Sequence, residues 1–102
     1  MMLTINQVDN KYFVSFNNVS KLNIINSLEI ENQLLNLTYK QGNSLILNLS
    51  EIKFIDSSGF ESLLKVYRSA KMNNTSLKLS NVSSEAIELL KLVELDKVFE
   101  LA

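Results

Sequence analysis

The sequence contains neither cysteine nor histidine among its 102 residues. Without cysteine, disulfides, cysteine-ligated zinc and thiol catalysis are excluded. Without histidine, the usual general base, the Ser-His-Asp triad and most transition-metal sites are also excluded. Only two glycines are present, so neither a P-loop nor a dinucleotide-binding fingerprint can be written. We therefore expect a protein that is not an enzyme, with no catalytic residue, no metal site and no cofactor.

Charge and hydropathy exclude two further classes of partner. The 10 basic and 11 acidic residues give a net charge of -1, and no basic cluster predicts direct contact with nucleic acid or anionic lipid. The longest apolar runs, such as residues 45–47, are far too short to insert into a membrane. No basic region followed by an apolar core opens the chain, so we expect a cytoplasmic protein. The length fits one domain over residues 1–102, and the balanced composition favours a monomer.

The first half of the chain predicts a hairpin followed by a helix. Residues 3–8 alternate apolar and polar, residues 12–16 resemble a second strand, and Asp9-Asn10 is typical of the turn between them. The apolar spacing then lengthens and predicts an amphipathic helix over residues 23–39. Its expected inner face is Ile24, Ile25, Leu28, Leu34, Leu35 and Thr38, with Glu29, Glu31 and Asn32 left to solvent.

The second half predicts two further helices between short strands. Residues 44–49 have the apolar pattern of a strand covered on both faces, and residues 76–79 and 98–101 resemble shorter strands. One helix begins near Ser58, which with Glu61 forms a capping-box pattern. Ser83 is placed to cap the other helix. The expected inner faces are Phe60, Leu63, Leu64, Tyr67 and Ala70 in the first, and Ala86, Ile87, Leu90 and Val93 in the second.

The predicted order of elements is β-β-α-β-α-β-α-β. A strand, a helix and a second buried strand indicate a crossover unit with some parallel pairing. We therefore expect an α/β fold, a small sandwich in which a mixed four- to five-stranded sheet is packed with three or more helices.

Polar residues and a helix start coincide in the segment Ile55-Asp56-Ser57-Ser58-Gly59-Phe60. Ligand sites gather where strands end in open α/β sheets, and a helix N-terminus offers unpaired N–H groups. On pattern alone the segment is more typical of an ordinary capped helix start, with Ser58 as the capping residue. Gly59 permits a close approach to the backbone. Ser57 has no evident structural duty, and a hydroxyl there is well placed for phosphorylation.

Residues 52–60 resemble the signature of the STAS domain, the family of bacterial anti-sigma factor antagonists. In that signature an apolar strand is followed by Asp-Ser-Ser/Thr-Gly-Leu. The tail is similar too, with residues 76–79, Ser83 and its helix, and then Leu92-Val93-Glu94-Leu95 and Val98-Phe99. The resemblance covers nearly the whole chain and implies the same order of strands and helices.

The resemblance implies a partner-switching role. In antagonists of the family the serine after the aspartate is phosphorylated, and that residue corresponds to Ser57. The unphosphorylated domain binds an anti-sigma factor that is also a serine kinase, which frees the sigma factor; phosphorylation breaks the complex and a serine phosphatase resets it. The partner-binding surface would contain Asp56, Ser58 and Gly59, with Lys21 and Asn23 at its edge.

Two departures from the family pattern leave the partner open. A Gly-acidic-apolar-Asp stretch usually precedes the first helix, whereas this chain has Ser20-Lys21-Leu22-Asn23, and a small residue after the motif is replaced by Glu61. These changes indicate either a different partner or a domain that docks without being phosphorylated.

Two other functions are weighed against the switch. In the first, the domain is a cytoplasmic accessory subunit of a membrane transport complex for lipids or anions, because some STAS proteins serve such transporters. In the second, it is a small hydrolase that uses Ser57 or Ser58 with a lysine base, although no lysine has the spacing of a dyad.

Overall fold

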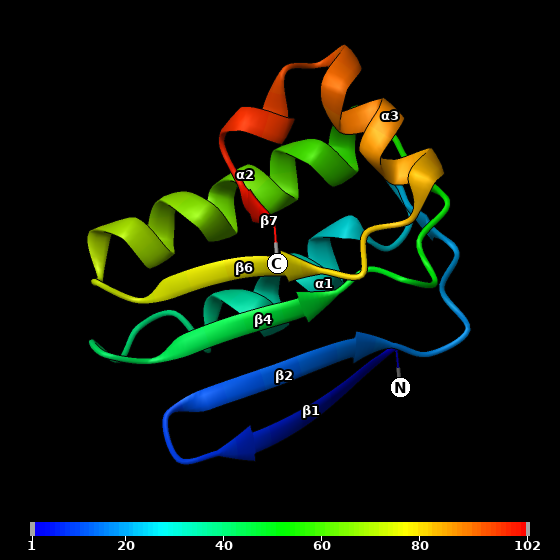
Figure 1. Cartoon of the computed structure of the whole chain (residues 1–102). Coiled ribbons are helices and arrows are strands. Elements are labelled where there is room, and N and C mark those ends of the chain that lie inside the picture. The colour runs from blue at the N-terminus through cyan, green and yellow to red at the C-terminus, as the bar shows by residue number, and fades with distance from the viewer. Residues whose placement is uncertain (1, 102) are drawn as a thin grey trace.

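The computed structural model of the chain describes residues 2–101 and contains a five-stranded mixed sheet (Figure 1). The strand order is β1-β2-β4-β6-β7. Strands β1 (Leu3–Val8) and β2 (Lys11–Phe16) form an antiparallel hairpin, and the remaining neighbours pair in parallel. These later strands are β4 (Ser44–Asn48), β6 (Ser76–Ser80) and β7 (Glu100–Leu101). The predicted hairpin and mixed sheet are thus confirmed.

A second, very small sheet lies beside the main one. It consists of β3 (Lys21–Leu22) and β5 (Phe54–Ile55), which pair in parallel. Two residues are too few to show a period, so hydrophobic patterning could not identify β3. The pair matters because β5 leads directly into the longest helix of the molecule.

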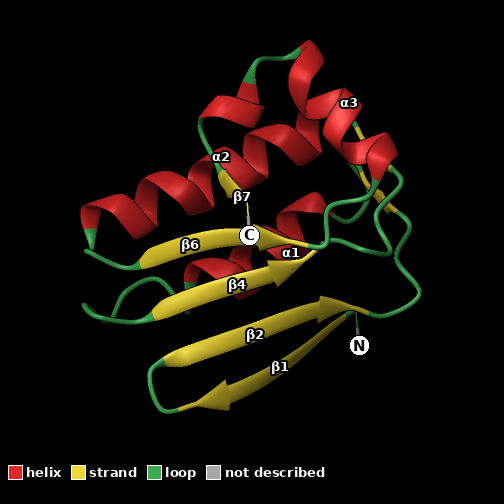
Figure 2. Ribbon diagram, in the orientation of Figure 1, coloured by secondary structure: helices red, strands yellow, loops and turns green. Residues whose placement is uncertain are grey.

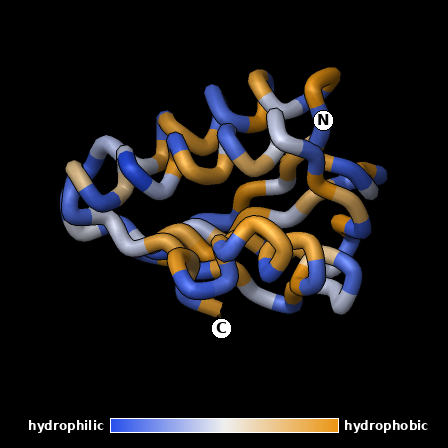
Figure 3. Tube along the Cα trace, turned by 90° about the horizontal axis from the view of Figure 1, so that it is seen from above, coloured by the Kyte–Doolittle hydropathy of each residue, from blue (hydrophilic) through white to orange (hydrophobic). Residues whose placement is uncertain are grey.

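Three α-helices cover one face of the main sheet, with a 3-10 turn near the end of the chain (Figure 2). They are α1 (Ser27–Leu35), α2 (Ser57–Met72) and α3 (Ser84–Leu92), followed by η1 (Leu95–Lys97). Apolar and hydrophilic residues alternate along the helices in Figure 3, as expected for helices with one buried side. Among residues 2–101, none of the helices has the length and apolar character required to cross a membrane.

The core lies between these helices and the leucine face of the sheet. Alternate residues of β4 and β6 are buried, including Leu45, Leu47 and Leu79. Each such side chain contributes about 1.5–3 kcal/mol when it leaves water. The opposite face of the sheet remains accessible, with Phe13 of β2 43% exposed and Ile46 of β4 only half-buried, so the prediction that this strand is covered on both faces was wrong. All three helices therefore belong to one layer.

The first helix is shorter than predicted, and its expected inner face was wrong at the N-terminal end. It begins at Ser27, and the preceding Ile24 and Ile25 are 76% and 89% exposed. The Asn23 side chain accepts hydrogen bonds from the backbone N–H groups of Ile25 and Asn26, at 3.0 and 3.4 Å. This local turn competes with helical hydrogen bonding and delays the helix start. The residues that α1 buries are Ser27, Ile30, Glu31 and Leu34.

The C-terminal part shows one confirmed cap and two corrections. Ser83 caps α3 as predicted, because its Oγ accepts a hydrogen bond from the backbone N–H of Ala86 at 3.1 Å. Val93 does not face the core; α3 ends before it, and its side chain is 47% exposed. The final strand is confined to residues 100–101, because the backbone N–H groups of Val98 and Phe99 donate to the Leu95 carbonyl at 3.1 and 3.2 Å and continue the turn that begins with η1.

A buried polar contact joins the first two helices. The Ser62 hydroxyl of α2 donates to the Glu31 carboxylate of α1 at 2.8 Å, and Glu31 is only 8% exposed. The expectation that Glu31 faces solvent was therefore wrong. The helical period does not reveal that Glu31 is buried, because it does not show which side chain lies opposite on α2. The hydrogen bond from Ser62 lowers the cost of burying the Glu31 carboxylate.

Replacing Ser62 with alanine should destabilise the fold. The buried Glu31 carboxylate would lose its serine donor, and an unsatisfied buried polar group costs about 1–3 kcal/mol. We expect the free energy of unfolding in urea to fall by that amount. Ser84→Ala, an exposed serine in α3, should change it by less than about 0.5 kcal/mol. Equal effects of the two substitutions would contradict a stabilising Glu31–Ser62 contact.

Candidate functional site

The predicted site residues come together where β3, β5 and the start of α2 meet. Asp56 follows β5 in an extended conformation and is the N-cap of α2, because its Oδ1 accepts from the Gly59 backbone N–H at 2.9 Å. The predicted capping box of Ser58 with Glu61 was therefore wrong. Ser58 lies inside the first turn, and Glu61 instead forms an exposed ion pair with Lys65 at 3.9 Å. The strand end places the aspartate, rather than the serine, at the capping position.

The second Asp56 carboxylate oxygen binds a different part of the chain. Oδ2 accepts a hydrogen bond from the backbone N–H of Ile24 at 3.2 Å, while the backbone N–H of Asp56 donates to the Leu22 carbonyl at 3.0 Å. One half-buried side chain thus joins the start of α2 to the connection between β3 and α1. Asp56, which was predicted to belong to the partner-binding surface, therefore also holds two segments of the fold together; we call this pair of hydrogen bonds the Asp56 bracket.

Gly59 allows a close approach, as predicted, and the approaching segment belongs to this chain. A Cβ atom at this buried position would lie 2.6 Å from the Leu22 carbonyl oxygen and 2.8 Å from the Leu22 Cβ. Real Cβ atoms do not come so close to other heavy atoms, so any larger residue would push β3 away from α2. The buried Gly59 therefore determines how closely β3 can approach α2.

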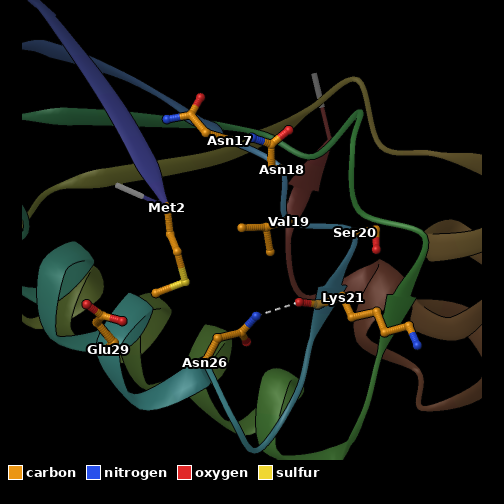
Figure 4. Close-up of a pocket in the computed structure, with 8 residues that line it drawn as sticks. All are labelled: Met2, Asn17, Asn18, Val19, Ser20, Lys21, Asn26 and Glu29. Carbon is orange, nitrogen blue, oxygen red and sulfur yellow. Dashed lines mark hydrogen bonds between the residues drawn. The ribbon is translucent and has the colours of Figure 1, made fainter.

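Lys21 and Asn23 occupy the loop beside this junction. Asn23 is half-buried and shapes the turn before α1, whereas Lys21 is exposed. The Asn26 side chain donates to the Lys21 carbonyl at 2.8 Å, and the Lys21 side chain points away from the neighbouring depression (Figure 4). That open depression is lined by Met2, Asn17, Asn18, Val19, Ser20, Lys21, Asn26 and Glu29.

The two serines of the motif differ in position. Ser57 is exposed and is the first residue of α2, whereas Ser58 is half-buried and lines a shallow groove between α1 and α2 together with Leu28. The first N–H groups of a helix have no partners within it and carry a partial positive charge. An anion attached to Ser57 would therefore lie in a favourable electrostatic field.

Three exposed apolar residues border the junction, and we call Ile24, Ile25 and Leu28 the apolar rim. Their side chains are 76%, 89% and 63% exposed. Sequence reasoning placed them in the core. One signal could have corrected this: Ile30 and Leu34 define the inner face of α1 by their four-residue spacing, and Leu28 lies two positions out of step with Ile30. Clustered exposed apolar side chains are typical of interaction surfaces.

Charges around the start of α3 provide a local comparison for α2. Ser84 is the first residue of α3, is exposed, and donates to the Glu85 carboxylate at 3.0 Å. The backbone N–H of Glu85 itself, then the Ser84 hydroxyl and then the charge of Lys53 hold the pKa of Glu85 below its usual range. Ser84 thus resembles Ser57 in helix position and in having an acidic neighbour, but it belongs to α3 and not to the junction of β3, β5 and α2.

Comparison with known proteins places this geometry in a family. The model of the STAS domain matches residues 4–102. The chain belongs to the STAS domain family. An anti-sigma-factor antagonist (STAS) domain protein from Planctomyces limnophilus has a similar structure, with a TM-score of 0.86 and 19% identity; the match covers 97% of this chain and 87% of that one.

Two further STAS-like structures differ in what they represent. The Bacillus cell fate determinant SpoIIAA in its phosphorylated form gives a TM-score of 0.71 at 17% identity, covering 98% of this chain and 90% of that one. A sulfate transporter family protein from Wolinella succinogenes gives a TM-score of 0.69 at 17% identity, and the match covers 89% of this chain and 72% of that one. At these identities the likeness establishes the shared fold.

Substitutions at Asp56 should separate its two hydrogen bonds. Asp56→Ala removes both acceptors, and loss of an N-cap costs about 0.5–2 kcal/mol. Asp56→Asn retains one acceptor oxygen for Gly59 but presents an amide nitrogen, which cannot accept, toward Ile24. We expect urea unfolding to show a smaller loss for Asp56→Asn than for Asp56→Ala. In hydrogen exchange followed by NMR, Asp56→Asn should accelerate the Ile24 amide and leave Gly59 protected; unchanged exchange at Ile24 would contradict the bracket.

Proposed function

We propose that this STAS domain is an anti-sigma factor antagonist controlled by phosphorylation of Ser57. In the unphosphorylated form it binds an anti-sigma factor that is also a serine kinase, and thereby frees the sigma factor in the cytoplasm. Phosphorylation of Ser57 ends the complex, and a serine phosphatase restores binding. The observation that carries the proposal is the exposure of Ser57 beside the apolar rim, at a junction held by Asp56 and Gly59.

The surroundings of Ser57 give phosphorylation a large effect on docking. The apolar rim has to lose water when a partner covers it, and a phosphate adds about -1.5 to -2 charges at its border. Burying that charge in an apolar contact beside the Asp56 carboxylate costs desolvation and like-charge repulsion. A loss of only about 2.8 kcal/mol weakens a complex about a hundredfold.

A phosphate on Ser57 would leave the fold of the junction undisturbed. Ser57 is the first residue of α2, where helix dipole and unpaired N–H groups favour an anion. The hydrogen bonds of Asp56 to Gly59 and Ile24 do not use the Ser57 side chain. Phosphorylation would thus change the charge of the surface while leaving the junction in place.

The local chemistry supports binding more than catalysis. Both Asp56 carboxylate oxygens accept from backbone N–H groups, so the acid beside Ser57 is occupied. Lys65, which lines the groove with Ser58, pairs with Glu61 and is exposed.

The family's acidic residue in the stretch before α1 is replaced by the exposed Lys21. We therefore expect a partner surface with an apolar centre and an acidic group that faces Lys21.

A second candidate is an accessory subunit of a membrane transport complex. The structural likeness to a sulfate transporter family protein supports this alternative. In that case the apolar rim would contact a transporter component, and Ser57 would need no modification.

Charge at Ser57 should release the partner. We would capture partners from the native cytoplasm with the wild-type chain, Ser57→Ala and Ser57→Asp, and identify them by mass spectrometry. Wild type and Ser57→Ala should retain an anti-sigma factor with a kinase domain, and Ser57→Asp should weaken its binding at least about tenfold. Ser84→Asp is the matched control, because it adds the same charge at the first residue of another helix.

The other outcomes separate the two candidates. The purified kinase partner should phosphorylate wild type at Ser57, and the product should no longer bind it. Capture of the same transporter components by wild type and Ser57→Asp would favour the accessory subunit instead. Equal loss of binding with Ser57→Asp and Ser84→Asp would mean that added charge acts non-specifically, and would contradict a switch at Ser57.

The apolar rim should contribute to partner affinity without contributing to stability. Leu28 is 63% exposed, so Leu28→Ser should leave the urea unfolding transition almost unchanged and weaken partner binding about tenfold or more. Leu92→Ser is the control, because Leu92 is a 78% exposed leucine in α3. Isothermal titration with the captured partner would measure both, and an unchanged affinity for Leu28→Ser would remove the apolar rim from the interface.

A further inference from the structure

The two edges of the main sheet are protected to very different degrees. At one edge, β7 has two residues, and Glu100 pairs with Lys78 of β6 at 3.7 Å. At the other edge, β1 has six residues, LTINQV, with no charge, proline or glycine. Its pairing with β2 runs from Leu3 to Val8 without a bulge. Short length, charge, proline and bulges are the devices that keep sheet edges from pairing with other chains, and β1 has none of them.

The outer side of β1 is accessible. All residues from Thr4 to Val8 are exposed, and β1 lies at the sheet edge farthest from α2 and α3 (Figures 1 and 2). The backbone N–H of Asn17 donates to the Met2 carbonyl at 2.8 Å, which fixes the alternation of the antiparallel ladder. The backbone N–H and C=O groups of Leu3, Ile5 and Gln7 therefore point away from β2, toward the edge.

We infer that β1 is an interface for a second copy of this chain, paired antiparallel with its own equivalent. The two-fold axis passes beside Ile5, so that each Ile5 faces the other. Leu3 then faces Gln7, and Thr4 faces Asn6. This register uses the three outward-pointing backbone positions of each strand and joins the two sheets into one.

The sequence of β1 suits pairing with itself in particular. A two-fold axis brings every side chain close to its own equivalent or to one from the same short strand, so a charged strand would repel its copy at several positions. The uncharged β1 avoids this repulsion. Ile5, which is 40% exposed, would be covered by an identical apolar side chain at the axis. The pairing is also closed, because the charged and short β7 edge offers no second strand of comparable length.

This interface is independent of the proposed switch at Ser57 and departs from the monomer that overall composition favours. Composition averages over the whole surface and does not register the charge of one edge strand. The dimer would carry two copies of the Ser57 site, and the residues that define that site lie outside β1.

A charge-exchange experiment tests the pairing and its register together. Sedimentation equilibrium over a wide concentration range should show that the wild-type chain dimerises. Ile5→Lys and Ile5→Glu should each weaken the dimer at least about tenfold, because the axis places two like charges opposite each other. An equimolar mixture of the two variants should recover a one-to-one heterodimer. Leu101→Lys, at an exposed position of the β7 edge, should dimerise like wild type.

The remaining results would overturn the proposal. A wild-type chain that stays monomeric at all concentrations would leave β1 without a second copy as its partner. A dimer that persists in Ile5→Lys, or variants that fail to form a heterodimer while circular dichroism shows them folded, would place the contact elsewhere. Assemblies that grow beyond two copies would contradict the closed pairing.

Discussion

The site depends on a single carboxylate that accepts hydrogen bonds from two separate segments. Asp56 caps α2 through Gly59 and holds the β3–α1 connection through Ile24. The fit is possible because Gly59 has no side chain and lets Leu22 approach the helix. Neither contact is strong by itself, since hydrogen bonds to charged groups contribute about 1.5–3 kcal/mol each. Their value is geometric, because they fix where the apolar rim lies relative to Ser57.

The Asp-Ser-Ser-Gly segment therefore combines different demands at adjacent positions. Asp56 and Gly59 satisfy the fold, Ser58 faces the groove between α1 and α2, and Ser57 alone is both exposed and structurally uncommitted. The proposed switch needs a rigid support next to the phosphorylated group, because a mobile segment would let the added charge move out of the contact surface. The two hydrogen bonds of Asp56 would supply the rigidity, and the first position of α2 gives Ser57 its exposure.

The sequence predicted those features that arise from regular spacing or local capping. The hairpin, the strands that contain the buried Leu47 and Leu79, and the Ser83 cap all follow from short-range patterns. The start of α1 and the burial of Glu31 could not be predicted from hydrophobic spacing. The first depends on hydrogen bonds that the Asn23 side chain accepts within its own turn, and the second depends on Ser62, which is distant in sequence. The asparagines of the chain have a local structural role at some positions. With two glycines in the chain, left-handed turn conformations are taken by residues that include Asn18, Asn74 and Asn81.

The exposed apolar residues extend this argument from the fold to its surroundings. Ile24 and Leu28 lie at the junction that contains Ser57, whereas Ile5 lies on an uncharged edge strand whose outward backbone groups have no neighbouring strand among residues 2–101. In the proposed switch, phosphorylation would add a charge beside the first group and make its partner contacts reversible. The second group lies on a strand without a charged residue, so in the inferred dimer its contacts would depend on the concentration of the chain. On the two proposals, one domain of 102 residues would present a regulated surface at the Ser57 junction and a constitutive one along β1, each with apolar side chains that its own core leaves exposed.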